Sequence, residues 1–282
     1  MQIERSFVTL EEGQLHLRRL HAARAPQSCP LLLLHASPSS SWFMQGLMKA
    51  IAERGASRHL IAPDTLGNGD SAPPRGERPD IAYFADSLRR MLDELAVPQV
   101  DVYGSHTGAR IACELAAAFP QRVRRVIFDG IIEYDDATRQ LIVDHYAPQV
   151  APDHYGRHLL WAFNFVRDQA LYFPYFQRDP AHRLAGAMPD AATLHRATLD
   201  VLKALDSYSK PYLAAFEYRA YSRMPQVRAP VLLLRPDAEL PVLNEAIAQA
   251  IAHLPDARVA RVGAGDAAKA AAITGFLDSE RP

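Results

Sequence analysis

The sequence predicts an α/β fold in which a mostly parallel central sheet of about eight strands is flanked by helices and carries a helical cap insertion. Short apolar runs of the kind expected for strands covered on both faces alternate with longer segments of helical periodicity. This alternation implies crossover connections, which join parallel strands. One long interval, residues 131–223, contains no convincing strand and is rich in helical and aromatic sequence.

The first predicted element is a β-hairpin. Residues 7–10 and 14–19 have strand character, and Glu11-Glu12-Gly13 between them is typical of a turn. The predicted inner strands follow at residues 31–34, 59–62, 100–103, 123–128, 231–234 and 258–262. The predicted helices between them span residues 42–54, 81–95, 109–119 and 242–253.

The missing strands in the middle of the chain indicate an insertion. We expect residues 1–130 and 224–282 to form the α/β core, and residues 131–223 to form a helical cap. An insertion that follows the fourth crossover strand lies over the carboxyl edge of the sheet, where open α/β sheets bind ligands. We therefore expect the cap to cover a binding site for a small-molecule substrate.

Composition and charge exclude several classes of protein. Apolar residues make up 49% of the 282 residues, which is enough to build a substantial core. The formal net charge is -1 and the basic side chains are scattered, so nucleic acid and anionic membranes are poor partners. No apolar run approaches the roughly 18 residues of a membrane span, and the first residues do not resemble a secretory signal.

Cysteine usage favours a reducing compartment. Cys29 and Cys113 are too few for a disulfide framework, so we expect a cytoplasmic protein. The sequence also allows a homodimer, because cap and edge elements of such folds can pair. We expect no cofactor, since neither a Gly-x-Gly-x-x-Gly turn after a first strand nor a phosphate-binding loop is present. His154 and His158 have a metal-compatible spacing on a helix, but they lack an evident acidic third ligand, so we expect no metal site.

The most informative segment is Gly104-Ser-His-Thr-Gly108, which lies between a predicted strand and a predicted helix. Two glycines around the central residue are typical of a strained elbow that projects one side chain above the sheet. That central residue is His106. Moving the frame by one residue would place Tyr103 and Thr107 at the close-packed flanks, where both would clash, so Ser105 is predicted to be a flank.

Three motifs in order resemble the α/β-hydrolase superfamily, in particular its members with a helical cap. The first is His35-Ala-Ser-Pro38, which is similar to the His-Gly-x-Pro segment of that superfamily. The second is the loop from Pro63 to Ser71, which matches Pro-Asp-x-x-Gly-x-Gly-x-Ser and in which Asp64 is expected to bind backbone donors. The third is the elbow, whose central position normally holds Ser, Cys or Asp.

The resemblance implies a catalytic relay whose residues are altered here. The acid expected after the strand at residues 231–234 maps to Glu239, with Asp237 as the neighbouring alternative. The position of the usual histidine base, in a Gly-x-Gly-His turn, is held by Asp266. We therefore expect a dyad of His106 and Asp266 with Glu239 behind or beside it, in which a carboxylate fixes the imidazole tautomer and makes the free nitrogen a better base. Asp266 can equally serve as the N-cap of the last helix.

The same resemblance implies an anion-binding pocket under the cap. The backbone N–H groups of Thr107 and Ser37 are the expected oxyanion donors. In the cap, Trp161 is a candidate for substrate contact, and an inward-facing arginine such as Arg167 would hold a substrate carboxylate by paired hydrogen bonds. Arg157 and Arg178 are the alternatives to Arg167.

Three functions remain open on the sequence. In the first, His106 is the general base, or the nucleophile, of an enzyme that acts on a small apolar or aromatic carbonyl compound by hydrolysis, lyase or isomerase chemistry. In the second, the chain has kept the pocket, lost the chemistry and binds a ligand. In the third, it is a conventional hydrolase whose residues lie outside the elbow, such as Ser37 with a histidine of the cap.

Overall fold

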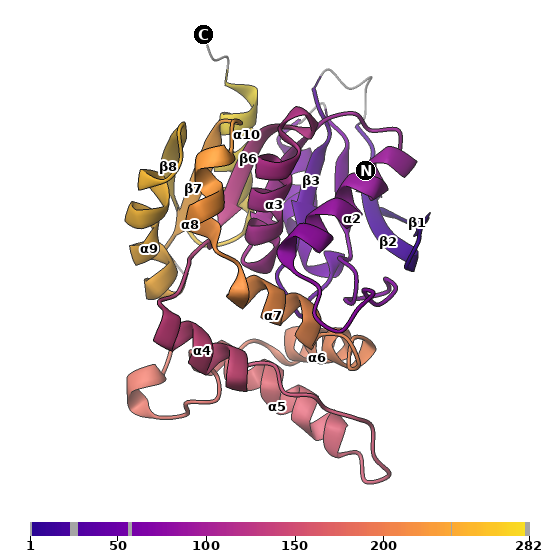
Figure 1. The fold of residues 1–282 in the computed structure, drawn as a ribbon, viewed down its shortest axis with the longest axis vertical. Coiled ribbons are helices and arrows are strands. Elements are labelled where there is room, and N and C mark those ends of the chain that lie inside the picture. Colours follow the sequence, from indigo (N-terminus) through magenta and orange to yellow (C-terminus); the bar gives the residue numbers. More distant parts are fainter. Residues whose placement is uncertain (1, 23–27, 56–57, 238, 280–282) are drawn as a thin grey trace.

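The computed structural model describes residues 2–22, 28–55, 58–237 and 239–279, and it contains an eight-stranded sheet with the order β1-β2-β4-β3-β5-β6-β7-β8 (Figure 1). The pairs β1–β2 and β2–β4 are antiparallel, and every other neighbouring pair is parallel. This arrangement confirms the predicted sheet. The strands are β1 Glu4–Leu10, β2 Gly13–Leu20, β3 Leu31–Leu34, β4 Leu60–Pro63, β5 Val100–Ser105, β6 Val123–Asp129, β7 Val231–Pro236 and β8 Ala257–Val262.

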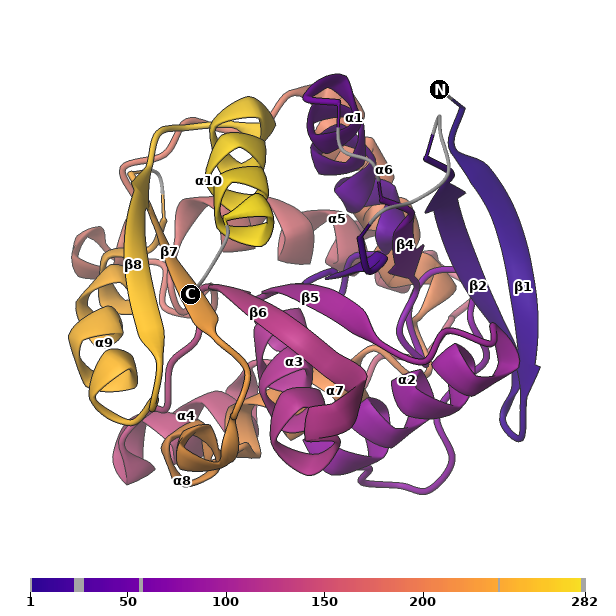
Figure 2. The ribbon, with the colours of Figure 1, turned by 90° about the horizontal axis from the view of Figure 1, so that it is seen from above.

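Helices cover both faces of the sheet (Figure 2). Helices α1 and α10 lie on one face, and α2, α3 and α9 lie on the other. The predicted helix at residues 42–54 begins as a 3-10 turn, Ser41–Met44, because the Ser40 hydroxyl caps the turn at Trp42 N–H. The bounds of these helices are α1 Gln45–Glu53, α2 Ile81–Glu94, α3 Thr107–Ala118, α9 Pro241–Ala252 and α10 Asp266–Asp278.

The inner strands are apolar along their whole length because both of their faces are buried. In β3, Leu32 and Leu34 belong to the apolar cluster under α2 and α3, whereas Leu31 and Leu33 belong to the cluster under α1 and α10. Alternate residues of a strand point to opposite faces, so the four leucines of β3 pack into the apolar clusters on both sides of the sheet. This is why a continuous apolar run, rather than an alternating one, marks these strands in the sequence.

The segment between β6 and β7 holds the helices α4 to α7, which lie beyond one end of the sheet (Figure 1). They pack mainly through rings: an apolar cluster of their own includes Tyr146, Phe165, Tyr175, Tyr208 and Tyr212. A short helix α8 then returns the chain to the core. The bounds are α4 Asp136–His145, α5 Arg157–Leu171, α6 Ala191–Lys203, α7 Ser209–Glu217 and α8 Ala220–Arg223.

Among the described residues, no helix combines the length and the apolar character that crossing a lipid bilayer requires.

The junction of β5 and α3 is sterically tight and requires glycine at two positions. A Cβ on Gly104 would lie 2.3 Å from the carbonyl oxygen of Gly108, and a Cβ on Gly108 would lie 2.4 Å from the carbonyl oxygen of Leu34. Both obstacles are backbone atoms, so they cannot move aside without distorting β3 or α3.

We expect Gly108→Ala to lower the free energy of unfolding by about 1–3 kcal/mol, because the methyl group overpacks the junction. Gly275→Ala is the matched control: Gly275 is also helical, and a Cβ there meets nothing within 4 Å. That substitution should stabilise the protein by roughly 0.5–1 kcal/mol through helix propensity. Urea unfolding followed by circular dichroism measures both, and a stabilising Gly108→Ala would contradict the packing argument.

Candidate active site

His106 occupies the tip of the turn between β5 and α3 and has φ 48° and ψ -103°. A positive φ is rare for a residue with a side chain and is tolerated where the surroundings enforce it. Here His106 N–H donates to the carbonyl oxygen of Asp129 at 2.9 Å, which ties the turn to β6. The frame predicted from the sequence agrees with this geometry, since Ser105 ends β5 and Thr107 begins α3.

The His106 ring is hydrogen-bonded to Glu239, in the loop after β7, with 3.1 Å between Nε2 and Oε2. Gly130 makes room for this contact, because a Cβ there would lie 3.2 Å from His106 Nε2. The second carboxylate oxygen of Glu239 accepts the N–H of Leu240 at 2.8 Å. The Glu239 side chain is only 11% exposed, so both of its oxygens are oriented by the protein.

Electrostatics keep Glu239 ionised at neutral pH. Burial alone would raise the pKa of this carboxyl, but the hydrogen bond and charge of His106, together with the Leu240 N–H, hold the pKa below its ordinary value. An ionised carboxylate can only accept hydrogen bonds, so Nε2 of His106 carries the proton. The lone pair is then on Nδ1, for which the described residues provide no hydrogen-bond partner. His106 therefore presents a free basic nitrogen.

The expected contact between His106 and Asp266 is not formed: within the part of the chain that the structure describes, the two side chains share no hydrogen bond or ion pair. Asp266 is the first residue of α10, and its carboxylate lies against α1, so close to Gly46 that a Cβ there would fall 2.0 Å from Oδ2. Burial raises the pKa of Asp266, and the Lys269 ammonium opposes this effect. Asp266 does not cap α10 by a hydrogen bond either, because the N-cap residue is Gly265.

A second polar group lies beneath the elbow. Asp129 ends β6, is fully buried, and accepts hydrogen bonds from the Tyr103 hydroxyl and the Lys269 ammonium, both at 2.5 Å.

Of the two acids left open by the sequence, Asp237 and Glu239, only Glu239 contacts His106 among the described residues. Asp237 is half exposed and pairs with Arg261 at 2.8 Å. The histidine thus has Glu239 as its acidic partner, and Lys269 has Asp129.

The two predicted oxyanion donors flank the same space as His106. Thr107 is the first residue of α3, so its N–H has no acceptor inside the helix. Ser37 lies in the loop after β3, and both residues line a cavity of about 300 Å³ together with His106. Backbone N–H groups at a helix start also benefit from its partial positive charge. This part of the cavity is suited to a developing anion.

The rest of the cavity is aromatic and comes from the segment between β6 and β7. Its rings are those of Tyr134, Tyr146, Phe173, Tyr212 and Phe216. Such a wall buries flat apolar groups and offers tyrosine hydroxyls at its margin. The cavity therefore lies between the carboxyl edge of the sheet and helices α4 to α7.

Two predicted substrate contacts lie elsewhere. Trp161 is partly buried and stacks on Phe165, with 4.8 Å between ring centroids, so it packs against the aromatic cluster of the helical segment and is not among the residues that line the cavity. Arg167 binds its neighbour Asp168, and Arg178 binds the same carboxylate. Arg157 is 78% exposed. None of these side chains is among those that line the cavity.

The arginine that does line the cavity is Arg110, on α3. It is 4% exposed, and its guanidinium donates to the carbonyl oxygens of His106 at 3.2 Å and Ile132 at 2.8 Å. Arg110 is not among the site residues predicted above, although the sequence carries a signal for it: it follows His106, the N-cap residue of α3, by four residues, and residues at this spacing share a helix face. The aromatic lining residues and Gln169 had no comparable signal.

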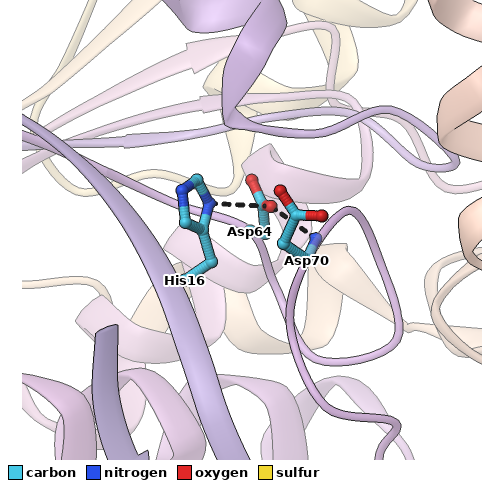
Figure 3. Close-up of side chains that lie close together, drawn as sticks. All are labelled: His16, Asp64 and Asp70. Atoms are coloured by element: carbon cyan, nitrogen blue, oxygen red, sulfur yellow. Dashed lines mark hydrogen bonds and ion pairs between the residues drawn. The ribbon is translucent and has the colours of Figure 1, made fainter. Parts of the chain in front are cut away.

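Possible metal ligands meet at a different place. His154 and His158 gain no third ligand; instead, among the described residues, His16, Asp64 and Asp70 come together (Figure 3). Asp64 Oδ2 accepts from His16 Nδ1 at 3.0 Å and from Asp70 N–H at 2.8 Å, and Oδ1 accepts from Ser41 N–H at 2.7 Å. Arg5 donates to the other ring nitrogen of His16. These groups satisfy one another and fasten the β4 loop to the hairpin.

A family model for the α/β-hydrolase fold matches residues 30–268. The chain belongs to the α/β-hydrolase fold family. Among curated proteins it is 34% identical over 101 residues to a 2-hydroxymuconate semialdehyde hydrolase of Pseudomonas sp. (strain CF600), a match that covers 36% of each chain. It is 29% identical over 103 residues to a 2-hydroxy-6-oxo-2,4-heptadienoate hydrolase of Pseudomonas putida (strain F1), covering 36% of this chain and 37% of the relative. These matches span little more than a third of the relatives' length.

Solved structures agree over nearly the whole chain. Epoxide hydrolase A from Mycobacterium thermoresistibile superposes with a TM-score of 0.74 at 19% sequence identity, covering 98% of each chain. The enol-lactonase from Burkholderia xenovorans LB400 gives a TM-score of 0.64 at 17% identity over 96% of each chain. At such low identity these likenesses show the fold alone, so the chemistry must be argued from the site.

We expect Asp64→Asn to lower the free energy of unfolding at pH 7 by roughly 2–4 kcal/mol, because it removes a buried charge that accepts three hydrogen bonds. Burial raises the pKa of Asp64, but the hydrogen bond from His16, the nearby His35 and two backbone N–H groups hold it well below its ordinary value. A lowered pKa gives stability that is present above the unfolded value of about 3.9 and is lost below it. The deficit of the variant should therefore shrink as the pH falls below about 4.

Urea unfolding at pH 7 and at acidic pH measures this deficit. Asp86→Asn is the control, because Asp86 is 41% exposed on α2 and its ion pairs lie on the surface. Its effect should stay within about 1 kcal/mol. A deficit of Asp64→Asn that is equal at both pH values would show that the carboxylate charge is not what stabilises the loop.

Proposed function

We propose that the chain is a hydrolase in which His106 acts as a general base on a water molecule, in place of the hydroxyl nucleophile of a serine hydrolase. The observation that carries this proposal is the hydrogen bond of 3.1 Å between His106 Nε2 and Glu239, which leaves Nδ1 without a partner among the described residues, on a side chain that lines the cavity. The substrate is a small carbonyl compound with apolar or aromatic surface, as the ring-lined cavity favours.

The proposed reaction has two proton transfers. His106 Nδ1 takes a proton from water while the water oxygen attacks the substrate carbonyl carbon, and Glu239 stabilises the imidazolium that forms. The carbonyl oxygen becomes an oxyanion that accepts hydrogen bonds from the N–H groups of Thr107 and Ser37. When the intermediate collapses, the bond to the leaving group breaks and the imidazolium returns its proton to that group. The products are a carboxylic acid and the protonated leaving group.

Family membership and relatives favour hydrolysis over the lyase and isomerase alternatives. The two relatives described above are named as hydrolases of a semialdehyde and of an oxo-substituted dienoate, both of which contain a carbonyl group. Asp266 has no part in the proposed reaction, because its carboxylate lies against Gly46.

The conventional alternative is less well supported. It needs a histidine next to the Ser37 hydroxyl, but Ser37 Oγ is buried without a hydrogen-bond partner among the described residues. His145, the histidine at the end of α4, packs on Phe176 at 5.6 Å and does not line the cavity. The alternative of a binding protein without chemistry is tested by turnover.

The test is a panel of 4-nitrophenyl esters, aryl lactones and 1-phenyl-1,3-butanedione, assayed with the wild type and variants. His106→Gln should lower kcat/KM by about 10²–10⁴. Glu239→Gln should lower it by about tenfold, because the neutral amide no longer stabilises the imidazolium that forms during the reaction. Ser105→Ala is the control and should leave kcat/KM unchanged, since Ser105 is an elbow flank.

Two outcomes would reject the proposal. Covalent labelling of Ser37 by an aryl phosphonate, with loss of turnover, would favour a hydroxyl nucleophile. Turnover that is unchanged in His106→Gln would favour chemistry elsewhere. If the wild type turns over no member of the panel, a binding protein is favoured.

A further inference from the structure

The cavity contains a buried cation that no carboxylate in the described part of the chain neutralises. Arg110 lines the cavity and is 4% exposed, yet no carboxylate among the described residues forms an ion pair with it. Two of its five N–H groups donate to backbone carbonyls, and Nε has no hydrogen-bond partner. An unpaired charge removed from water costs several kcal/mol, so a site of this kind calls for a counter-charge.

Another buried arginine, Arg58, is neutralised by carboxylates of the protein. The Arg58 side chain is 1% exposed, and its guanidinium binds Asp101 at 2.8 Å as well as Asp278. The groups that surround Arg110 are neutral at physiological pH: the hydroxyls of Tyr134, Tyr218 and Tyr221 and the thiol of Cys113. Burial accordingly lowers the pKa of the Arg110 guanidinium, although an arginine remains charged at neutral pH. None of these groups supplies an anion to pair with Arg110, so a ligand that carries one would complete the site.

We propose that Arg110 binds a carboxylate of the substrate, so that the compounds hydrolysed are carbonyl acids. This inference rests on the proposed function, in which His106 acts at the carbonyl group. A planar guanidinium binds a carboxylate through paired hydrogen bonds, which fix its orientation as well as its position. Binding would neutralise the buried charge and would hold the substrate at one defined distance from the base.

The spacing of the two residues limits the length of the acid. Arg110, in the first turn of α3, follows the N-cap residue His106 by four residues, which separates them by roughly 6 Å along the helix axis. A carboxylate at Arg110 and a carbonyl carbon next to His106 are then about three or four bonds apart in the substrate. Tyr134 also lines the cavity, and its hydroxyl stays protonated because burial raises its pKa. It can donate a hydrogen bond to the same carboxylate.

The test compares 4-oxo-4-phenylbutanoate with its neutral carboxamide by isothermal titration calorimetry at pH 7. This acid has the required spacing, carries an aromatic ring and is not itself hydrolysed. The wild type should bind the acid at least about tenfold more tightly than the amide. This comparison needs no substitution and therefore does not depend on the folding of a variant.

Variants assign the preference to one residue. Arg110→Gln should bind the acid no better than the amide, and Arg110→Lys should keep part of the preference because it keeps the charge and loses the paired geometry. Arg178→Gln is the matched control, because Arg178 pairs with Asp168 in the helical segment and does not line the cavity. Circular dichroism confirms that each variant is folded.

The outcomes separate this inference from the proposed function. His106→Gln should keep the preference for the acid over the amide, because that preference depends on Arg110. A wild type without turnover that still prefers the acid would keep the carboxylate site and reject the hydrolase. Equal affinity for acid and amide in the wild type, including no binding of either, overturns the inference. A preference that survives in folded Arg110→Gln, or disappears in Arg178→Gln, overturns it as well.

Discussion

The contact between the start of α3 and the end of β3 is the constraint on which the site depends. His106 can hold φ 48° because Gly108 brings α3 against the carbonyl oxygen of Leu34, where no side chain fits. The Asp129 carbonyl fixes the turn from the other side. Three neighbouring strands therefore meet at one backbone junction. The loops that leave these strands carry Ser37, His106 and Gly130, so the same packing that strains the turn also aligns the groups around the cavity.

Charge is distributed unevenly around this junction. Below it, Lys269 forms an ion pair with Asp129. At the cavity, the His106 ring is hydrogen-bonded to the Glu239 carboxylate. Arg110 alone among the charged lining residues has no partner in the described part of the chain. The charge of Arg110 acts on an oxyanion at Thr107 in the same direction as the start of α3 does. A cation that orients one anionic group of a substrate also favours the negative charge that develops at the other end.

The sequence predicted the features that depend on local pattern. Strand burial produces continuous apolar runs, and the elbow requires glycine at two set positions, so the sheet and His106 could both be placed. Glu239 could be found because it follows a strand by a short count along the chain. Asp266 was misplaced because its direction depends on where α10 begins: the helix starts at Asp266 itself, which turns the carboxylate toward Gly46.

The arginine in the cavity was missed for a related reason. Arg167 and Arg110 have the same side chain, and only their tertiary partners distinguish them. Asp168, next to Arg167 in the sequence, neutralises it. Arg110 instead lies near Tyr134 before α4, Tyr218 after α7 and Tyr221 in α8. Helix periodicity shows which residues share a face but not what that face meets. Trp161 was predicted to contact the substrate for the same reason and packs, partly buried, against the aromatic cluster of the helical segment instead.

Among the described residues, α6 and the segment before α7 are tied to the core by buried hydrogen bonds, whereas α4 and α5 are not. Asp200 on α6 accepts a hydrogen bond from Ser40 at 2.7 Å, and the Ser207 hydroxyl, before α7, donates to the Gly67 carbonyl at 2.9 Å, both in buried surroundings. Helices α4 and α5 pack chiefly on α7 and α6, not on the sheet. Moving α6 or α7 would break buried polar bonds, whereas moving α4 and α5 separates mainly aromatic contacts. Tyr146 and Phe173 follow α4 and α5 and line the cavity. The aromatic side of the cavity is therefore held by weaker contacts than the side that carries His106 and Arg110.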